Sequence, residues 1–104
     1  MDIDKPIIMS AIPVDEHTVV IIMKDPVVRI GKFRGFEIFM LEDDVYSKKP
    51  WKWVANLSAE RRSYQVEGLK SNVKYNFRVR SCFEYLGCSD FSETHAAVAV
   101  KPGQ

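Results

Sequence analysis

The chain has 104 residues, of which 46% are hydrophobic, 12% aromatic and 28% charged, and its formal net charge is +1 at pH 7. This balance excludes a disordered, charge-rich chain, and it provides no long-range field that would favour nucleic acid or an acidic membrane surface. A chain of this size buries roughly two-thirds of its extended surface in one two-layer domain, which leaves little room for a deep catalytic cavity. We therefore expect a single domain over residues 1–104, with 101–104 as an outgoing linker.

The predicted elements in the first two-thirds of the chain are all strands. The first, 7–12, ends before Pro13. The second, 17–24, is β-branched and apolar on both faces, which predicts a central strand. Shorter runs with a period of two predict further strands at 36–41 and 64–67, and the stretch 51–55 is another candidate strand.

The clearest strand follows at 75–82, where Tyr75, Phe77 and Val79 alternate with polar or charged residues. A seventh candidate covers 94–100. Turn residues separate these runs at intervals of about ten residues, and no window shows a convincing helical stripe. The pattern predicts an all-β, seven-stranded immunoglobulin-like β-sandwich, with a small closed barrel as the alternative.

The two cysteines fall on a predicted hairpin near the end of the chain. If the last strands turn about Tyr85, Cys82 opposes Cys88 at a Cα separation that antiparallel neighbours share with disulfides. Such a bond closes a short loop and would add about 2.4 kcal/mol to the free energy of unfolding in the chain-entropy model. It would therefore constrain the loop more than it would stabilise the whole fold. It is feasible in an oxidising compartment and not in a reducing one.

A second feature that depends on the compartment is the triplet Asn56-Leu57-Ser58. It has the pattern of an N-glycosylation acceptor in a secreted chain, although such triplets also arise by chance. Together with the cysteines, it favours an extracellular or cell-surface location, with the cytoplasm as the alternative.

Trp, Leu and Tyr landmarks occur at characteristic separations in three stretches of the chain, 51–54, 64–69 and 75–81. With them the sequence resembles a fibronectin type III domain over essentially its whole length. The resemblance implies that Leu69 closes the connection between the fifth and sixth strands. It also implies that the Tyr75 ring packs inward with its hydroxyl bonded to nearby backbone. Matches that are weak alone follow at Gly87, Ser89 and Ser92.

The chain departs from the family pattern in the second strand. Members usually have a tryptophan three residues before a proline, and here Met23 stands three residues before Pro26. Methionine is an adaptable filler, so we expect a looser core centre and modest stability unless another aromatic side chain replaces the indole. The residues that could do so are Phe36, Trp51 and Trp53.

A weaker resemblance concerns a stacked ladder of side chains. Arg78 and Arg80 are expected to project beside Phe39 and one tryptophan, with each exposed stacked contact worth about 0.5–1 kcal/mol. Such a ladder is similar to that of the membrane-proximal fibronectin-like domain of class I cytokine receptors, where arginines interleave with a Trp-Ser-x-Trp-Ser motif. Residues 88–92 match two of the four motif positions and lack both tryptophans.

The sequence contains no motif that would bring together residues for catalysis or for metal binding. Cys82 and His95 are conceivable as nucleophile and base, but no motif supports the pair. The carboxylates at 42–44 lack a calcium-loop context, and His17 has no second ligand at a zinc spacing. We therefore expect no enzyme activity, no metal and no cofactor. An integrin-type Arg-Gly-Asp loop is also absent, because Arg34-Gly35 is followed by Phe36.

The expected binding surface combines two loops that a sandwich brings to one pole. An apolar centre with a basic rim is typical of a protein-binding patch, although the same side chains could instead plug the sandwich end or contact a neighbouring domain. The predicted contact residues are Val27, Val28, Arg29, Ile30, Lys32, Phe83, Tyr85 and Leu86.

The leading hypothesis is a non-catalytic protein–protein interaction module from a larger multidomain adhesion or receptor-type protein. Its partners would be another protein and neighbouring domains of its own chain, with no nucleic acid and no direct membrane insertion. The alternatives are a structural spacer in a tandem array, either extracellular or in a sarcomere-type intracellular protein, and an accessory domain attached to an enzyme.

Overall fold

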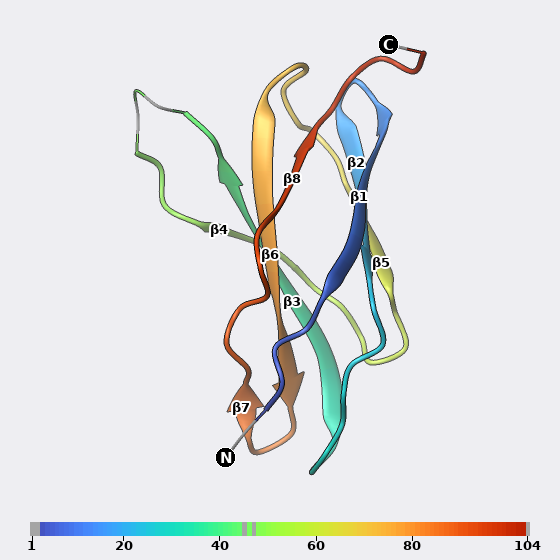
Figure 1. The fold of residues 1–104 in the computed structure, drawn as a ribbon, viewed down its shortest axis with the longest axis vertical. Helices are drawn as coiled ribbons and strands as arrows, with labels where there is room; N and C mark the ends of the chain where they lie inside the picture. Colours follow the sequence, from blue (N-terminus) through green and yellow to red (C-terminus); the bar gives the residue numbers. More distant parts are fainter. Residues whose placement is uncertain (1–2, 45, 47, 104) are drawn as a thin grey trace.

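The computed structural model describes residues 3–44, 46 and 48–103. In this part of the chain two antiparallel sheets face each other, which confirms the all-β sandwich (Figure 1). The first sheet has the order β1-β2-β5, formed by β1 (Ile8–Asp15), β2 (Thr18–Met23) and β5 (Ser63–Val66). The second has the order β4-β3-β6, and β6 also pairs with two short strands on its other side. Its strands are β3 (Phe33–Glu42), β4 (Lys52–Asn56), β6 (Lys74–Phe83), β7 (Gly87–Cys88) and β8 (His95–Val98).

The core lies between the inward faces of the two sheets and follows the period-two pattern of the sequence. Alternate residues of β6 and β2 are buried, and the bulkiest fully buried side chains include Phe36 and Phe77. Met23 is 2% exposed and Phe36 is 1% exposed, whereas Trp53 is 54% exposed. Among the aromatic residues proposed to replace the missing indole, Phe36 is therefore the one that lies in the core.

The two landmarks of the second half occupy the positions that the resemblance implies. Leu69 and Tyr75 are both buried, and the Tyr75 hydroxyl accepts a hydrogen bond of 2.9 Å from the Lys70 backbone N–H. A buried phenol needs such a partner, and here the chain supplies it locally. The contact closes one end of the sandwich.

Three strands, β1, β3 and β6, are longer than predicted. β1 continues through Pro13, which pairs with Val19; an edge strand tolerates proline because its N–H side can face away from the ladder. β3 begins at Phe33 instead of Phe36 and passes through Gly35. Gly35 has φ +143°, and a Cβ there would collide with the Leu57 carbonyl oxygen, so glycine permits a close approach of backbones.

The connections gather at two ends of the long axis (Figure 1). We call the end with the 24–32 connection, the 57–62 segment and the β6–β7 turn the hairpin pole. The end with the 43–51 and 67–73 connections is the corner pole. The chain enters at the hairpin pole and leaves at the corner pole (Figure 1). Within the described residues, no helix is long and apolar enough to cross a membrane.

Candidate partner-binding site at the hairpin pole

Direct contacts join the two loops from which we predicted a binding surface. The Glu84 backbone N–H donates a 2.9 Å hydrogen bond to the Lys32 carbonyl oxygen, and Phe33 pairs with Phe83 in the β3–β6 ladder. The rings of these two phenylalanines meet edge to face with centroids 5.6 Å apart. The loops therefore form one continuous surface above a closed aromatic layer.

Four large apolar or aromatic side chains on these loops are exposed, and we call them the apolar patch. Tyr85 is 98% exposed, and each of the other three is about half exposed. The members of the patch are Val27, Val28, Ile30 and Tyr85. In general, a cluster of exposed apolar side chains marks an interaction site more often than the same residues scattered singly over a surface.

Two of the predicted contact residues are not among these exposed side chains, since one is buried and the other is half-buried. Phe83 is 4% exposed, because β6 continues one residue further than predicted and Phe83 falls on its inward-facing side. Leu86 is half-buried against Gly31, where an added Cβ would lie 2.6 Å from Leu86 Cδ1. The expectation that Phe83 is a surface contact was therefore wrong; its ring supports the loops.

Tyr85 occupies an unfavourable backbone conformation for its residue type. Its φ is +65°, in the left-handed region that favours glycine or asparagine. Such a position costs about 1 kcal/mol or more, and strain of this kind concentrates at functional sites. The turn thus holds a bulky ring in solvent at a position where a smaller residue would fit with less strain.

The two basic residues of the surface are both paired within the chain. Arg29 binds the Asp4 carboxylate with two parallel hydrogen bonds of 3.1 Å, and Lys32 lies 4.0 Å from Glu84. The Arg29 pair fixes the segment before β1 against the loop. The nearby depression lined by Ile3, Val27 and Phe83 has no volume for a water molecule. The surface beside Val27 is therefore shallow and lacks an enclosed pocket of the kind that binds small ligands.

A disulfide lies directly beneath the hairpin turn. Cys82 pairs with Cys88 in the β6–β7 ladder, and their sulfurs are 2.06 Å apart. The bond limits the movement of the turn that carries Tyr85. It also removes Cys82 as a thiolate nucleophile, and His95 pairs with Phe77, far along β6 from Cys82. Glu37 lies close to the two cysteines, but the disulfide leaves no thiolate there that could bind a metal ion.

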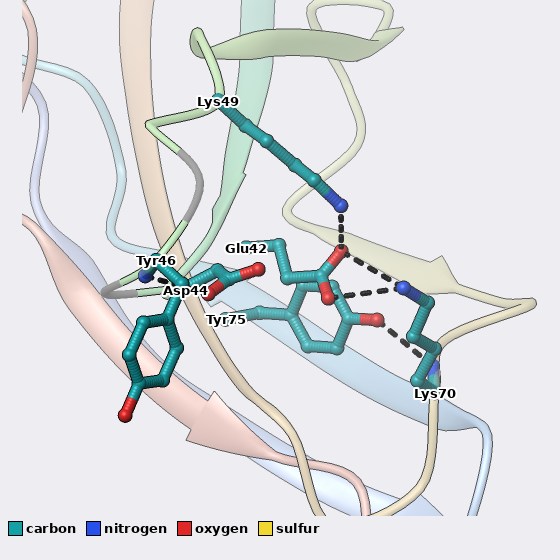
Figure 2. A network of polar contacts seen from close by, with 6 residues as sticks. All are labelled: Glu42, Asp44, Tyr46, Lys49, Lys70 and Tyr75. Carbon is teal, nitrogen blue, oxygen red and sulfur yellow. Dashed lines mark hydrogen bonds and ion pairs between the residues drawn. The ribbon is translucent and has the colours of Figure 1, made fainter.

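The carboxylates at 42–44 belong to the corner pole and are held by cations and backbone, as Figure 2 shows for Glu42 and Asp44. Glu42 accepts hydrogen bonds of 3.1 Å from Lys70 Nζ and from Lys49 Nζ. The hydrogen bond from Lys70, followed by that from Lys49, lowers the pKa of Glu42, and the same contact with Glu42 raises the pKa of Lys70. Asp43 pairs with Lys74, and Asp44 accepts a hydrogen bond from the Tyr46 N–H. The group is a network of ion pairs beside the buried Tyr75.

His17 is a surface residue that makes hydrogen bonds at the corner pole. Its Nδ1 donates a 2.8 Å hydrogen bond to the Leu69 carbonyl oxygen, and the Leu69 N–H donates to the His17 carbonyl oxygen at 3.0 Å. The ring thus has a structural partner at the landmark leucine.

The outer face of the second sheet carries the expected arginine ladder. The Arg78 guanidinium lies 4.1 Å from the centroid of Trp51 and 3.9 Å from that of Phe91, and Arg80 lies 5.2 Å from Phe91 and 5.4 Å from Phe39. Arg80 also pairs with Glu37 at 2.7 Å. Burial between two rings lowers the pKa of Arg78, and its Nε is buried without a hydrogen-bond partner in the described structure.

The central ring of the ladder, Phe91, was not among the predicted residues. It stands at the second tryptophan position of the Trp-Ser-x-Trp-Ser motif, which is the signal that could have identified it. The two matching serines hold the segment in place: Ser89 Oγ accepts a hydrogen bond from the Ser81 N–H, and Ser92 Oγ accepts one from the Val79 N–H. Both serines are buried, so the ladder is part of the architecture.

This sheet order, with an inward-facing tyrosine hydrogen-bonded at the end of the sandwich, defines an immunoglobulin-like β-sandwich. Solved structures specify its class. The chain is similar to the FN1–FN3 domains of chicken CNTN1 (TM-score 0.79, 18% identity, 96% of this chain and 33% of that chain). It is also similar to titin domains (0.76, 20%, 94% and 32%) and to FN3tt (0.70, 24%, 97% and 99%). The chain therefore has the fibronectin type III fold.

At the level of sequence, no family model matches the chain. A stretch of 59 residues is 39% identical to oncosphere antigen A of Hydatigena taeniaeformis. The stretch covers 57% of this chain and 19% of the antigen, so the similarity spans about a fifth of that protein's length.

Proposed function

We propose that this domain is a non-catalytic protein–protein interaction module of a larger, extracellular or cell-surface protein, and that it binds through the apolar patch at the hairpin pole. The observation that carries the proposal is the exposure of Val27, Val28, Ile30 and Tyr85 on two loops that a backbone hydrogen bond joins. Exposed tyrosine is a frequent anchor of protein interfaces, and a rigid surface loses little entropy on binding. The disulfide supports an oxidising location.

A module role is supported by CNTN1, titin and oncosphere antigen A, in which the matching part is a fraction of a longer chain. The positions of the two ends favour one alternative, a spacer in a tandem array, because the chain enters and leaves at opposite poles (Figure 1). In that case the domain that precedes this one would cover the apolar patch, since Asp4 ties the entering segment to Arg29. The two functions predict different partners for the same surface.

Site-specific crosslinking distinguishes them. A photoreactive benzoylphenylalanine replaces Tyr85 in the parent protein, and a matched control carries it at Gln65, an exposed position on the opposite sheet. We expect crosslinks to a separate protein from position 85 and none from position 65, with loss of the product when Val28→Glu is added. Crosslinks from position 85 to another domain of the same chain would support the spacer, and equal products from both positions would contradict both functions.

A further inference from the structure

An irregularity in β4 brings two residues of the outer sheet face together. The β3–β4 ladder pairs Ile38 with Ala55 but Phe39 with Trp53, so Val54 is an extra residue in β4. Residues three apart in a regular strand point to opposite faces, whereas the bulge places Trp53 and Asn56 on the same face. Trp53 Nε1 donates a 2.8 Å hydrogen bond to Asn56 Oδ1.

This hydrogen bond orients the amide of Asn56. An indole N–H only donates, so the atom that faces it must be the amide oxygen. The amide nitrogen Nδ2 is therefore not the atom that faces the indole N–H. Asn56 is exposed, and it lines a groove of about 400 Å³ together with Arg34, Glu37 and the disulfide. A substituent on Nδ2 thus has room on the surface of the folded domain without displacement of the backbone.

We propose that Asn56 carries an N-linked glycan whose first sugar packs on the Trp53 indole. The residue opens the acceptor triplet Asn56-Leu57-Ser58, and the disulfide supports passage through the oxidising compartment in which such transfer occurs. In the transfer, Nδ2 forms a bond to the anomeric carbon of a polyprenyl-pyrophosphate-linked oligosaccharide. The bond between that carbon and the phosphate oxygen breaks, the polyprenyl pyrophosphate leaves, and the amide loses one proton.

The proposal also accounts for an otherwise uncovered indole. Trp53 is 54% exposed on β4, the edge strand of the second sheet. Exposed apolar edge strands invite pairing with another chain, and proteins commonly cover or interrupt them. A sugar ring on the indole would cover this exposed apolar surface.

The first test measures occupancy. The tryptic peptide 53–61 from the natively produced protein is analysed by mass spectrometry before and after peptide N-glycosidase treatment, together with the 104-residue chain secreted from insect cells. We expect a glycan mass that the enzyme removes, leaving Asn56 converted to aspartate. Ser58→Ala should abolish the glycan while leaving the Asn56 side chain in place. An unmodified peptide 53–61 from natively produced, disulfide-bonded protein would overturn the proposal.

The second test addresses the indole. Melting temperatures are compared with and without the glycan in the natural sequence and in Trp53→Ala. We expect the glycan to raise the melting temperature of the natural sequence by a few degrees and to have a smaller effect in Trp53→Ala. An equal effect in both chains would overturn the packing of the sugar on Trp53, and Ser58→Ala reports any stability change that the glycan does not cause.

Discussion

The two poles of the sandwich use their side chains in opposite ways. At the corner pole the polar groups bind one another: the Tyr75 hydroxyl holds the Lys70 N–H, and Glu42 lies between two lysines (Figure 2). At the hairpin pole four apolar side chains project into solvent above the closed Phe33–Phe83 layer. The contrast indicates that polar contacts stabilise the corner pole, whereas the apolar patch of the hairpin pole lies outside the buried core.

The largest expected difference between the poles is in core packing. Leu69→Ala removes a buried side chain at the corner pole and should lower the free energy of unfolding by about 3 kcal/mol. Val28→Ala at the hairpin pole should change it by less than about 0.5 kcal/mol, because that side chain is half exposed. Urea unfolding of both variants measures the difference. Similar losses in the two variants would show that the apolar patch is part of the core after all.

The disulfide should have the next largest effect on stability, and it acts at the hairpin pole. Replacing both Cys82 and Cys88 with serine should lower the free energy of unfolding by about 2 kcal/mol, because the bond closes a short loop. The fold should survive, as judged by an unchanged circular dichroism spectrum. If this variant fails to fold, the hairpin pole is more important to the fold than the contrast between the poles implies.

A substitution of Tyr85 is a finer test of the contrast between the poles, because it should raise the free energy of unfolding while it abolishes binding at the hairpin pole. Tyr85→Asn places a residue that tolerates positive φ in the turn, so we expect a gain of about 0.5–1 kcal/mol in the free energy of unfolding. The same change should abolish the crosslinked product expected from the pole when the photoreactive residue stands at Ile30. Gly87, which also has positive φ, provides the control: Gly87→Asn should not stabilise the turn. A loss of stability in Tyr85→Asn would show that the ring supports the fold.

The predictable features of the molecule are those that depend on local pattern. The alternation over 75–82 predicts the inward face of β6, and the position of Tyr85 predicts that Cys82 lies opposite Cys88. The same alternation, extended by one residue, would have placed Phe83 in the core.

The remaining features arise from contacts between segments far apart in the chain. The Arg29–Asp4 pair and the position of Phe91 between two arginines depend on tertiary packing that no short window contains. The bulge that joins Trp53 to Asn56 becomes visible only once β4 is paired with β3. For this reason the sequence indicated the pole of the candidate site more reliably than the role of each residue in it.

The smallest effect is the pH dependence of the corner pole. Hydrogen bonds from Lys70 and Lys49 lower the pKa of Glu42, so the folded chain holds this carboxylate ionised at a pH where the unfolded chain begins to bind a proton. The stabilisation is therefore complete above the ordinary glutamate pKa of about 4.3 and is lost as the pH falls through the lower folded value.

Glu42→Gln should accordingly lower the free energy of unfolding slightly at neutral pH, and the difference from the natural sequence should vanish in acid. Urea unfolding across a pH series measures this difference, with Glu60→Gln, an exposed residue of the 57–62 segment, as the control. Added salt should reduce the difference, because the lysine side chains are largely exposed and their charges are screened. A difference that persists unchanged below the folded pKa would mean that Glu42 stabilises the pole through packing, and the contrast between a charge-linked and an apolar pole would then be wrong.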